Sequence, residues 1–217
     1  MKNLIILFLV SVPFVLDAYA HQPRLVTDQE NSLTNPIIIE EPEVSKAYYG
    51  QIEKSSEYYQ IGSNKEFDLY LSLQMPDVPM QGTNITLELF DKSGLQLAYL
   101  DGSKHNWVKF HEEFGNADYL SGPSIRTFLP AGIYSIKING DENTKYVLVA
   151  GYEEKFPMSE FLNSLFLVPK INNEFFGMNL IQSLGNIFGF MLLAIFCAIG
   201  LVVVFLVRQV RLVKNKP

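Results

Sequence analysis

The chain has 217 residues, enough for one domain of common size; 48% of them are apolar and 18% charged, and the formal net charge is −6. The mean hydropathy of +0.11 is high for a water-soluble domain and predicts segments that contact lipid. The net negative charge argues against nucleic-acid binding, which needs a face rich in Lys and Arg, and the single cysteine excludes an internal disulfide.

Residues 1–20 have the pattern of a secretory signal peptide. Lys2 precedes an apolar run of about 13 residues, which is shorter than the roughly 20 residues that a membrane span needs. The sequence AYA at positions 18–20 matches an A-x-A cleavage site. We therefore expect cleavage after Ala20, which would make His21 the first residue of the mature chain.

The next segment, residues 21–45, contains three prolines and an acidic cluster and is expected to be extended, with a short isoleucine run at 37–39. From residue 46 to residue 156, alternating apolar residues and turn signals recur about every eight to twelve residues, which is typical of an all-β sandwich or barrel. The predicted strands are 47–52, 57–61, 66–74, 84–90, 95–100, 106–110, 124–129, 132–138 and 145–152.

Several of these strands resemble the bacterial pre-peptidase C-terminal domain and related jelly-roll modules. The matching segments are EYYQI at 57–61, FDLYL at 67–71, ITLELFD at 85–91, LPAGIYSIKI at 129–138 and YVLV at 146–149. The sequence Pro-Ala-Gly-x-Tyr at 130–134 is the most recognisable of them. The resemblance implies a jelly-roll-like antiparallel β-sandwich that binds carbohydrate or protein, assists secretion or holds calcium.

Residues 157–186 are predicted to be a juxtamembrane linker that contains a short amphipathic helix. Ser159 is expected to cap this helix and Pro169 to end it. Such a helix lies either at the membrane interface or against the edge of the sandwich. The interfacial alternative predicts that a fragment ending near residue 156 is soluble, whereas one ending near residue 186 needs detergent.

Residues 187–207 form an uncharged apolar run of 21 residues. As a helix this run would be about 31 Å long, which matches the roughly 30 Å of a bilayer core. The tail, residues 208–217, carries four basic residues and is therefore expected to be cytoplasmic, with the N-terminal part outside. Residues 21–186 contain 12 Lys and Arg against 22 Asp and Glu, so the exported part has a net charge of −10 and the tail +4.

The predicted span also contains small residues at a spacing that lets two helices approach closely. They form the pairs Gly185 with Gly189 and Ala194 with Ala198. Homodimerisation through these residues is therefore a hypothesis, in addition to the contact of the span with membrane lipid.

Four aromatic residues between positions 107 and 119 are the candidate ligand-binding residues: Trp107, Phe110, Phe114 and Tyr119. Aromatic side chains offer flat contacts that suit sugars and protein partners. The sequence contains no nucleophile elbow, phosphate loop or H-E-x-x-H motif. We therefore predict a membrane-anchored, non-catalytic β-sandwich that presents a binding surface to a protein or glycan at the cell envelope.

A copper-binding redox protein is one alternative. The mature N-terminal His21 would chelate Cu(II) through its α-amine and Nδ1, and His105 or His111 would supply a further nitrogen. Carboxylates in the loops near residues 77, 91, 101 and 141 offer a calcium site, although turn formation explains them as well.

Another alternative follows from the order of the segments. A signal peptide, a small β-sandwich, one span and a short basic tail are similar to the cargo receptors of the early secretory pathway with a GOLD-type domain. Those proteins have a coiled coil before the span, and no sustained heptads precede the span here. An accessory subunit of a membrane complex is the remaining possibility.

Overall fold

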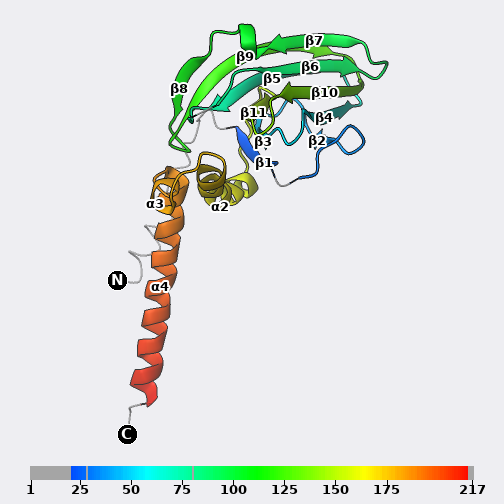
Figure 1. The fold of residues 1–217 in the computed structure, drawn as a ribbon. Helices are drawn as coiled ribbons and strands as arrows, with labels where there is room; N and C mark the ends of the chain where they lie inside the picture. The colour runs from blue at the N-terminus through cyan, green and yellow to red at the C-terminus, as the bar shows by residue number, and fades with distance from the viewer. Residues whose placement is uncertain (1–20, 28, 80, 215–217) are drawn as a thin grey trace.

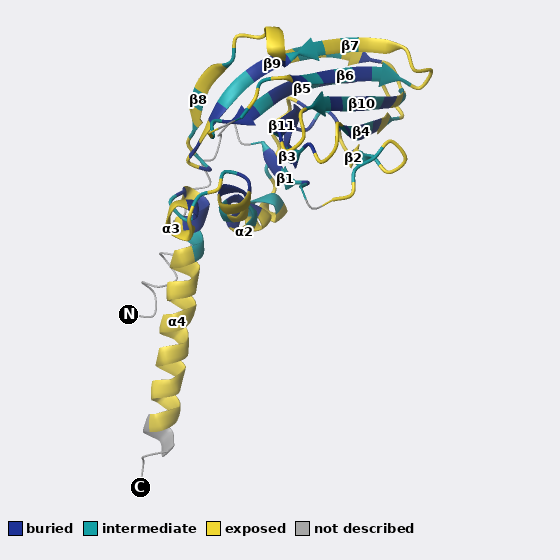
Figure 2. Cartoon of the chain, viewed as in Figure 1, coloured by how far each residue is buried: buried dark blue, intermediate teal, exposed yellow. Residues whose placement is uncertain are grey.

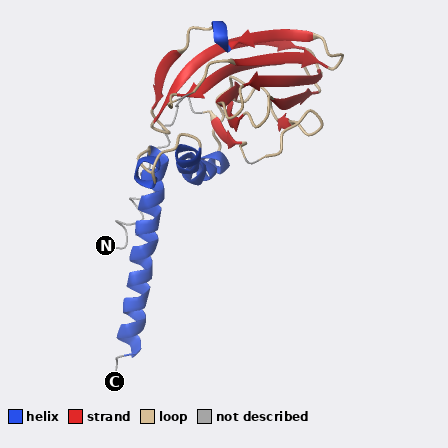
Figure 3. Ribbon diagram, viewed as in Figure 1, coloured by secondary structure: helices blue, strands red, loops and turns tan. Residues whose placement is uncertain are grey.

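The computed structural model describes residues 21–27, 29–79 and 81–214. Two stacked β-sheets form the body of the molecule, and three α-helices lie at one end of it, as Figures 1 and 3 show. The predicted signal peptide lies outside the described residues.

The strands alternate with short turns along the chain, as the sequence predicts. Their bounds are β1 (Gln22–Leu25), β2 (Ile37–Ile39), β3 (Lys46–Gln51), β4 (Ser56–Ser63), β5 (Phe67–Pro76), β6 (Ile85–Asp91), β7 (Gln96–Asp101), β8 (Val108–Glu112), β9 (Ala117–Leu129), β10 (Gly132–Gly140) and β11 (Lys145–Ala150). A 3₁₀-helix, η1 (Gly102–Lys104), follows β7. All nine predicted strands are confirmed, and β9 begins seven residues before the prediction for it.

The six-stranded sheet has the order β1-β3-β11-β5-β9-β8, and the five-stranded sheet has the order β2-β4-β10-β6-β7. The expected antiparallel sandwich is confirmed with one exception in each sheet. At one edge of the six-stranded sheet β1 pairs with β3 in parallel, and at one edge of the five-stranded sheet β2 pairs with β4 in parallel. Residues 21–45 therefore supply an edge strand to each sheet. The first of these, β1, was not predicted because it is only four residues long and contains a proline.

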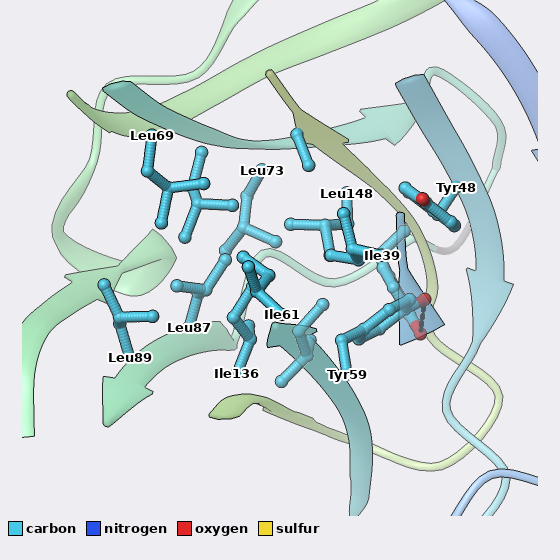
Figure 4. Close-up of a cluster of buried hydrophobic side chains, with 14 of the residues drawn as sticks. Ile39, Tyr48, Tyr59, Ile61, Leu69, Leu73, Leu87, Leu89, Ile136 and Leu148 are labelled. Carbon is cyan, nitrogen blue, oxygen red and sulfur yellow. Dashed lines mark hydrogen bonds between the residues drawn. The ribbon is translucent and has the colours of Figure 1, made fainter. Parts of the chain in front are cut away.

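The main hydrophobic core lies between the two sheets (Figure 4). The alternation in β5 is confirmed, because Phe67, Leu69, Leu71 and Leu73 are all at most 2% exposed. Burying each such side chain contributes about 1.5–3 kcal/mol to folding. Two tyrosine hydroxyls also lie in this core, and they satisfy each other: the hydroxyls of Tyr59 and Tyr146 are 2.8 Å apart.

Replacing Tyr146 by phenylalanine is expected to lower the free energy of unfolding by about 1–3 kcal/mol, because the buried hydroxyl of Tyr59 would lose its partner. Denaturant unfolding of the purified chain measures this effect. The double variant with Tyr59→Phe should be more stable than Tyr146→Phe alone, since it leaves no unpaired hydroxyl. A Tyr146→Phe chain as stable as the parent would contradict the buried pair.

Three α-helices follow the sandwich: α2 (Met158–Glu174), α3 (Leu180–Ser183) and α4 (Ile187–Lys214). Two predictions for α2 are wrong. The N-cap is Pro157 rather than Ser159, and Pro169 lies inside the helix instead of ending it. A proline inside a helix costs about 3 kcal/mol. The packing of Ile171 and Phe175 beyond it, each at most 2% exposed, offsets this cost.

Helix α2 packs on the outer face of the six-stranded sheet. The contact forms a second hydrophobic cluster, made of Ala47, Ala117, Tyr119, Val147, Val149, Ile171 and Phe175. Strand β11 is therefore covered on both faces, which explains its continuous apolar sequence. Residues 157–186 are thus part of the folded body rather than a free linker.

The beginning of α4 is fixed to α2. The side chain of Phe188 is buried with Leu165 and Val168, and Asn186 caps the helix by accepting a hydrogen bond of 2.9 Å from the backbone N–H of Gly189. Beyond this first turn α4 is exposed along its length (Figure 2). Its segment Ile187–Arg211 is long and apolar enough to cross a membrane.

The structure changes the interpretation of the small residues in this region. A Cβ atom at Gly189 would lie 2.4 Å from the carbonyl oxygen of Leu184, so this glycine permits a close approach within its own chain. Gly189 is buried and therefore not free to contact a second helix. Gly185 directly follows Leu184, the residue that Gly189 contacts. Ala194 and Ala198 are exposed on α4, and homodimerisation through them stays a prediction.

Candidate functional site

An open pocket of about 480 Å³ lies on the outer face of the six-stranded sheet. Its walls come from the β8–β9 hairpin and from β3, which lie at the edge of the area that α2 covers. The lining residues are His21, Ala47, Tyr49, Gln74, Phe110, His111, Glu112, Glu113, Phe114 and Tyr119. Three of the four predicted ligand-binding aromatics, and two of the three predicted metal-binding histidines, therefore line one pocket.

The aromatic wall of the pocket is built by strand register. Phe110 and Tyr119 are directly opposite each other in the β8–β9 pair, and their rings stack at a centroid distance of 5.3 Å. The hydroxyl of Tyr119 lies 3.0 Å from that of Tyr49 on β3. Tyr119 is only 4% exposed, so most of its ring is buried. Tyr119 forms the floor of the pocket, and Phe110 is the accessible partner.

The turn between β8 and β9 carries Phe114 and is held rigidly. The carboxylate of Glu112 accepts hydrogen bonds from the backbone N–H groups of Phe114 and Gly115, at 2.9 and 2.7 Å. The side-chain amide of Asn172 on α2 donates a 2.6 Å bond to the carbonyl of Gly115. Asn116 in turn donates to the carbonyl of Gly185, just before α4. The β8–β9 turn at the edge of the pocket is therefore hydrogen-bonded to the residue that lies just before α4.

A smaller chamber of about 50 Å³ continues from the pocket towards α2 and α4. The two cavities share His21, Tyr49, Glu112, Phe114 and Tyr119. Phe188 of α4 lines the inner chamber, and so does Ser164, whose fully buried hydroxyl has no hydrogen-bond partner among the described residues. Among the described residues, the inner chamber thus offers one buried hydroxyl that is not paired.

The pKa values of the two histidines in the pocket are shifted in opposite directions. The contact of His111 with the carboxylate of Asp118, at 2.7 Å, raises the pKa of the imidazole above its usual value. Burial lowers the pKa of His21, whose Nδ1 is hydrogen-bonded to the hydroxyl of Ser45. At neutral pH this arrangement favours a neutral His21 in the pocket and makes His111 the more readily protonated of the two.

Replacing Asp118 by asparagine is expected to lower the pKa of His111 towards its usual value, because the hydrogen bond to Asp118 is the main cause of the shift. Because the pKa is raised in the folded state, the contact stabilises the β8–β9 hairpin below about pH 6.5, and this contribution is lost as the pH rises through the folded-state pKa. NMR titration of the imidazole C–H signals measures the shift. Asp141→Asn, in another hairpin, is the control and should leave His111 unchanged; an equal pKa in the Asp118 variant and the parent would contradict the pair.

Trp107 and His105 do not line this pocket. The indole N–H of Trp107 donates a 2.7 Å hydrogen bond to the carbonyl of Gly102, and its ring packs against the main core. A Cβ atom at Gly122 would lie 2.5 Å from the ring, so the glycine makes room for the indole. His105 contacts the edge of the same ring. Trp107 therefore packs against the main core, whereas Phe110, Phe114 and Tyr119 line the pocket.

The described residues contain no group of three or more His, Cys, Asp or Glu side chains that could hold a metal ion. His105 lies beside Trp107, apart from the other two histidines, whereas His21 and His111 line the same pocket. A copper site that combines His21 with His111 therefore stays a prediction. The loop carboxylates serve the turns instead: Asp91 and Asp101 accept hydrogen bonds from Ser93 and Ser103, two residues further along. Asp77 pairs with Lys109 at 2.6 Å.

No protein-family model matches the chain, and no curated protein matches it in sequence. Among solved structures, the pre-peptidase C-terminal domain of a collagenase from Bacillus anthracis matches with 12% identity and a TM-score of 0.35, over 56% of this chain and 98% of that domain. The catalytic domain of a GH87 α-1,3-glucanase in complex with nigerose matches with 16% identity and a TM-score of 0.27, over 49% of this chain and 22% of that one.

The first of these neighbours is of the domain type that the sequence resembles.

Proposed function

We propose that the chain is a membrane-anchored, extracytoplasmic and non-catalytic binding module that holds a protein or glycan in the pocket beside the β8–β9 hairpin. The observation that carries the proposal is the convergence of Phe110, Phe114 and Tyr119 on one open pocket of about 480 Å³. Aromatic walls with a few polar groups at the rim are typical of ligand sites in proteins.

The anchoring part of the proposal is supported by α4. Its side chains beyond the first turns are exposed, although the helix is almost entirely apolar, which favours lipid as their surroundings. The basic residues that follow the apolar run favour a cytoplasmic tail. The sandwich and its pocket would then lie outside, close to the membrane surface.

The chemistry of the pocket suits a ligand with both flat and polar surfaces. The ring of Phe110 offers a stacking surface for a sugar ring or an aromatic side chain. Glu113 and His111 at the rim offer hydrogen-bonding groups of different charge. The carboxylate of Glu112 is already engaged by the hairpin turn and supports the site from within.

Alanine variants of the full-length chain test the binding proposal. Phe110→Ala and Phe114→Ala should abolish co-purification of a protein partner from the membranes of cells that make the chain, or binding to an immobilised glycan array. Leu97→Ala is the matched control, since Leu97 is 40% exposed on β7 in the other sheet and should leave binding unchanged. Binding that survives both pocket variants, or that is lost equally with Leu97→Ala, would contradict the assignment of the pocket.

A further inference from the structure

Five apolar side chains on α2 and α3 are exposed, and together we call them the apolar ledge. They are Met158, Leu162 and Phe166 on α2, with exposed fractions of 49, 52 and 61%, and Leu180 and Ile181 on α3, with 74 and 86%. The α2 members are spaced four residues apart, so they form one stripe along the helix. No charged residue lies within this stripe.

The ledge faces away from the sandwich. At 100° per residue, it lies roughly 160° around the axis of α2 from Ile171 and Phe175, which pack on the sheet. Between these two sides lie Leu165 and Val168, which contact Phe188 of α4. Around the axis of α2, the side that packs on the sheet is therefore followed by the side that contacts α4, and then by the exposed ledge.

The orientation of the helices places the ledge beside the apolar helix. Figure 1 shows α2 beside the upper end of α4, lying across it rather than continuing its direction. A helix that lies across the end of a membrane span is in a position to contact the membrane surface. Leu165 and Val168, which border the stripe on α2, hold Phe188 of α4, and the apolar segment Ile187–Arg211 begins at this contact. The stripe on α2 therefore adjoins the beginning of the apolar segment.

The charged groups of α2 fit the same arrangement. Glu160 points towards the sandwich and forms a bidentate ion pair with Arg24. The two guanidinium nitrogens of Arg24 each donate a 2.8 Å hydrogen bond to one carboxylate oxygen of Glu160. Ser159, Asn163 and Lys170 form the polar flank of the stripe. An amphipathic helix with these properties lies at the boundary between lipid headgroups and acyl chains.

We infer that the apolar ledge is immersed in the outer interface of the same bilayer that α4 spans. The occupant of this surface is lipid, because α2 holds Phe188 in the first turn of the apolar segment and the stripe borders that contact. The net charge of −10 in residues 21–186 gives no attraction to anionic lipid, so apolar contact is the expected basis of the interaction. The sandwich would rest on the membrane in a fixed orientation, with its pocket close to the surface. This inference depends on the membrane anchoring proposed above.

Spin-label accessibility in vesicles tests the inference. The full-length chain, with Cys197→Ala to remove the native thiol, receives single cysteines at Leu162, Phe166 or Ile181 and is reconstituted in vesicles of phosphatidylethanolamine and phosphatidylglycerol. Collision rates with oxygen and with a water-soluble nickel chelate then give the depth of each label. The three ledge labels are expected to lie about 5–10 Å below the headgroup boundary.

Three further labels serve as controls. Asn163→Cys, on the polar flank of α2, and Phe128→Cys, 71% exposed on β9, should remain in water. Val203→Cys, on α4, should lie deep in the acyl chains. If the label at position 203 is deep but those at 162 and 166 behave like the one at 163, the ledge does not contact lipid and the inference is wrong while anchoring stands. If the label at position 203 is in water, the proposed anchoring itself fails.

Discussion

Replacing Phe175 by alanine is expected to lower the free energy of unfolding by about 3–5 kcal/mol. The ring of Phe175 is 1% exposed and packs edge-on against Tyr49 and Phe176, at centroid distances of 5.2 and 5.3 Å. The ammonium group of Lys145 lies 5.5 Å from the ring centre. Alanine would leave a cavity beneath the candidate pocket. Unfolding by denaturant in detergent micelles, followed by the fluorescence of the only tryptophan, measures the effect.

Phe166→Ala is the matched control for this prediction. It makes the same chemical change within α2, which Phe175 directly follows, but Phe166 is 61% exposed, so the expected change in stability is within about 0.5 kcal/mol. Equal stability losses in the two variants would show that α2 does not pack on the six-stranded sheet in the way that the structure places it.

Replacing Trp107 by alanine is also expected to cost about 3–5 kcal/mol, although the indole is only half-buried. The substitution removes packing against the main core and leaves the carbonyl of Gly102 without its 2.7 Å hydrogen bond. Because Gly122 has no side chain to fill the space, the cavity would remain open. Thermal unfolding followed by circular dichroism measures the loss.

The same variant distinguishes packing from ligand binding at Trp107. Trp107→Ala is expected to leave the affinity of the folded protein for its ligand unchanged, since the indole does not line the pocket. Trp107→Phe should recover part of the lost stability. A Trp107→Ala protein of unchanged stability that no longer binds its ligand would restore the sequence-based assignment of this residue to the binding surface.

The strands could be predicted from the sequence because their signals are local. In β5 the alternation of Phe67, Leu69, Leu71 and Leu73 sets which face is buried, and this depends only on the two-residue repeat of a strand. The length of α2 could not be predicted, because it depends on a distant contact. The packing of Phe175 on Tyr49 offsets the cost of Pro169, and these residues are far apart in the sequence.

The candidate site could be predicted only in part for the same reason. Phe110, Phe114 and Tyr119 were found because aromatic residues cluster in one segment. Tyr49 was the missed member, although the adjacent pair Tyr48 and Tyr49 carried a signal: in a strand, one side chain of the pair faces the core and the other the outer surface. Trp107 could not be told apart from the other aromatic residues of this segment by sequence. Only its tertiary contact with Gly122 shows that it is a packing residue.

Site-specific photo-crosslinking tests the central claim, that a membrane-anchored sandwich binds its partner in this pocket. The full-length chain carries a benzophenone side chain in place of Phe114 and is irradiated in intact cells that make it. We expect a discrete adduct in the membrane fraction from position 114, and none from the control position Phe128, which is 71% exposed on β9. An adduct at position 128 without one at position 114, or identical adducts at both, would contradict the claim.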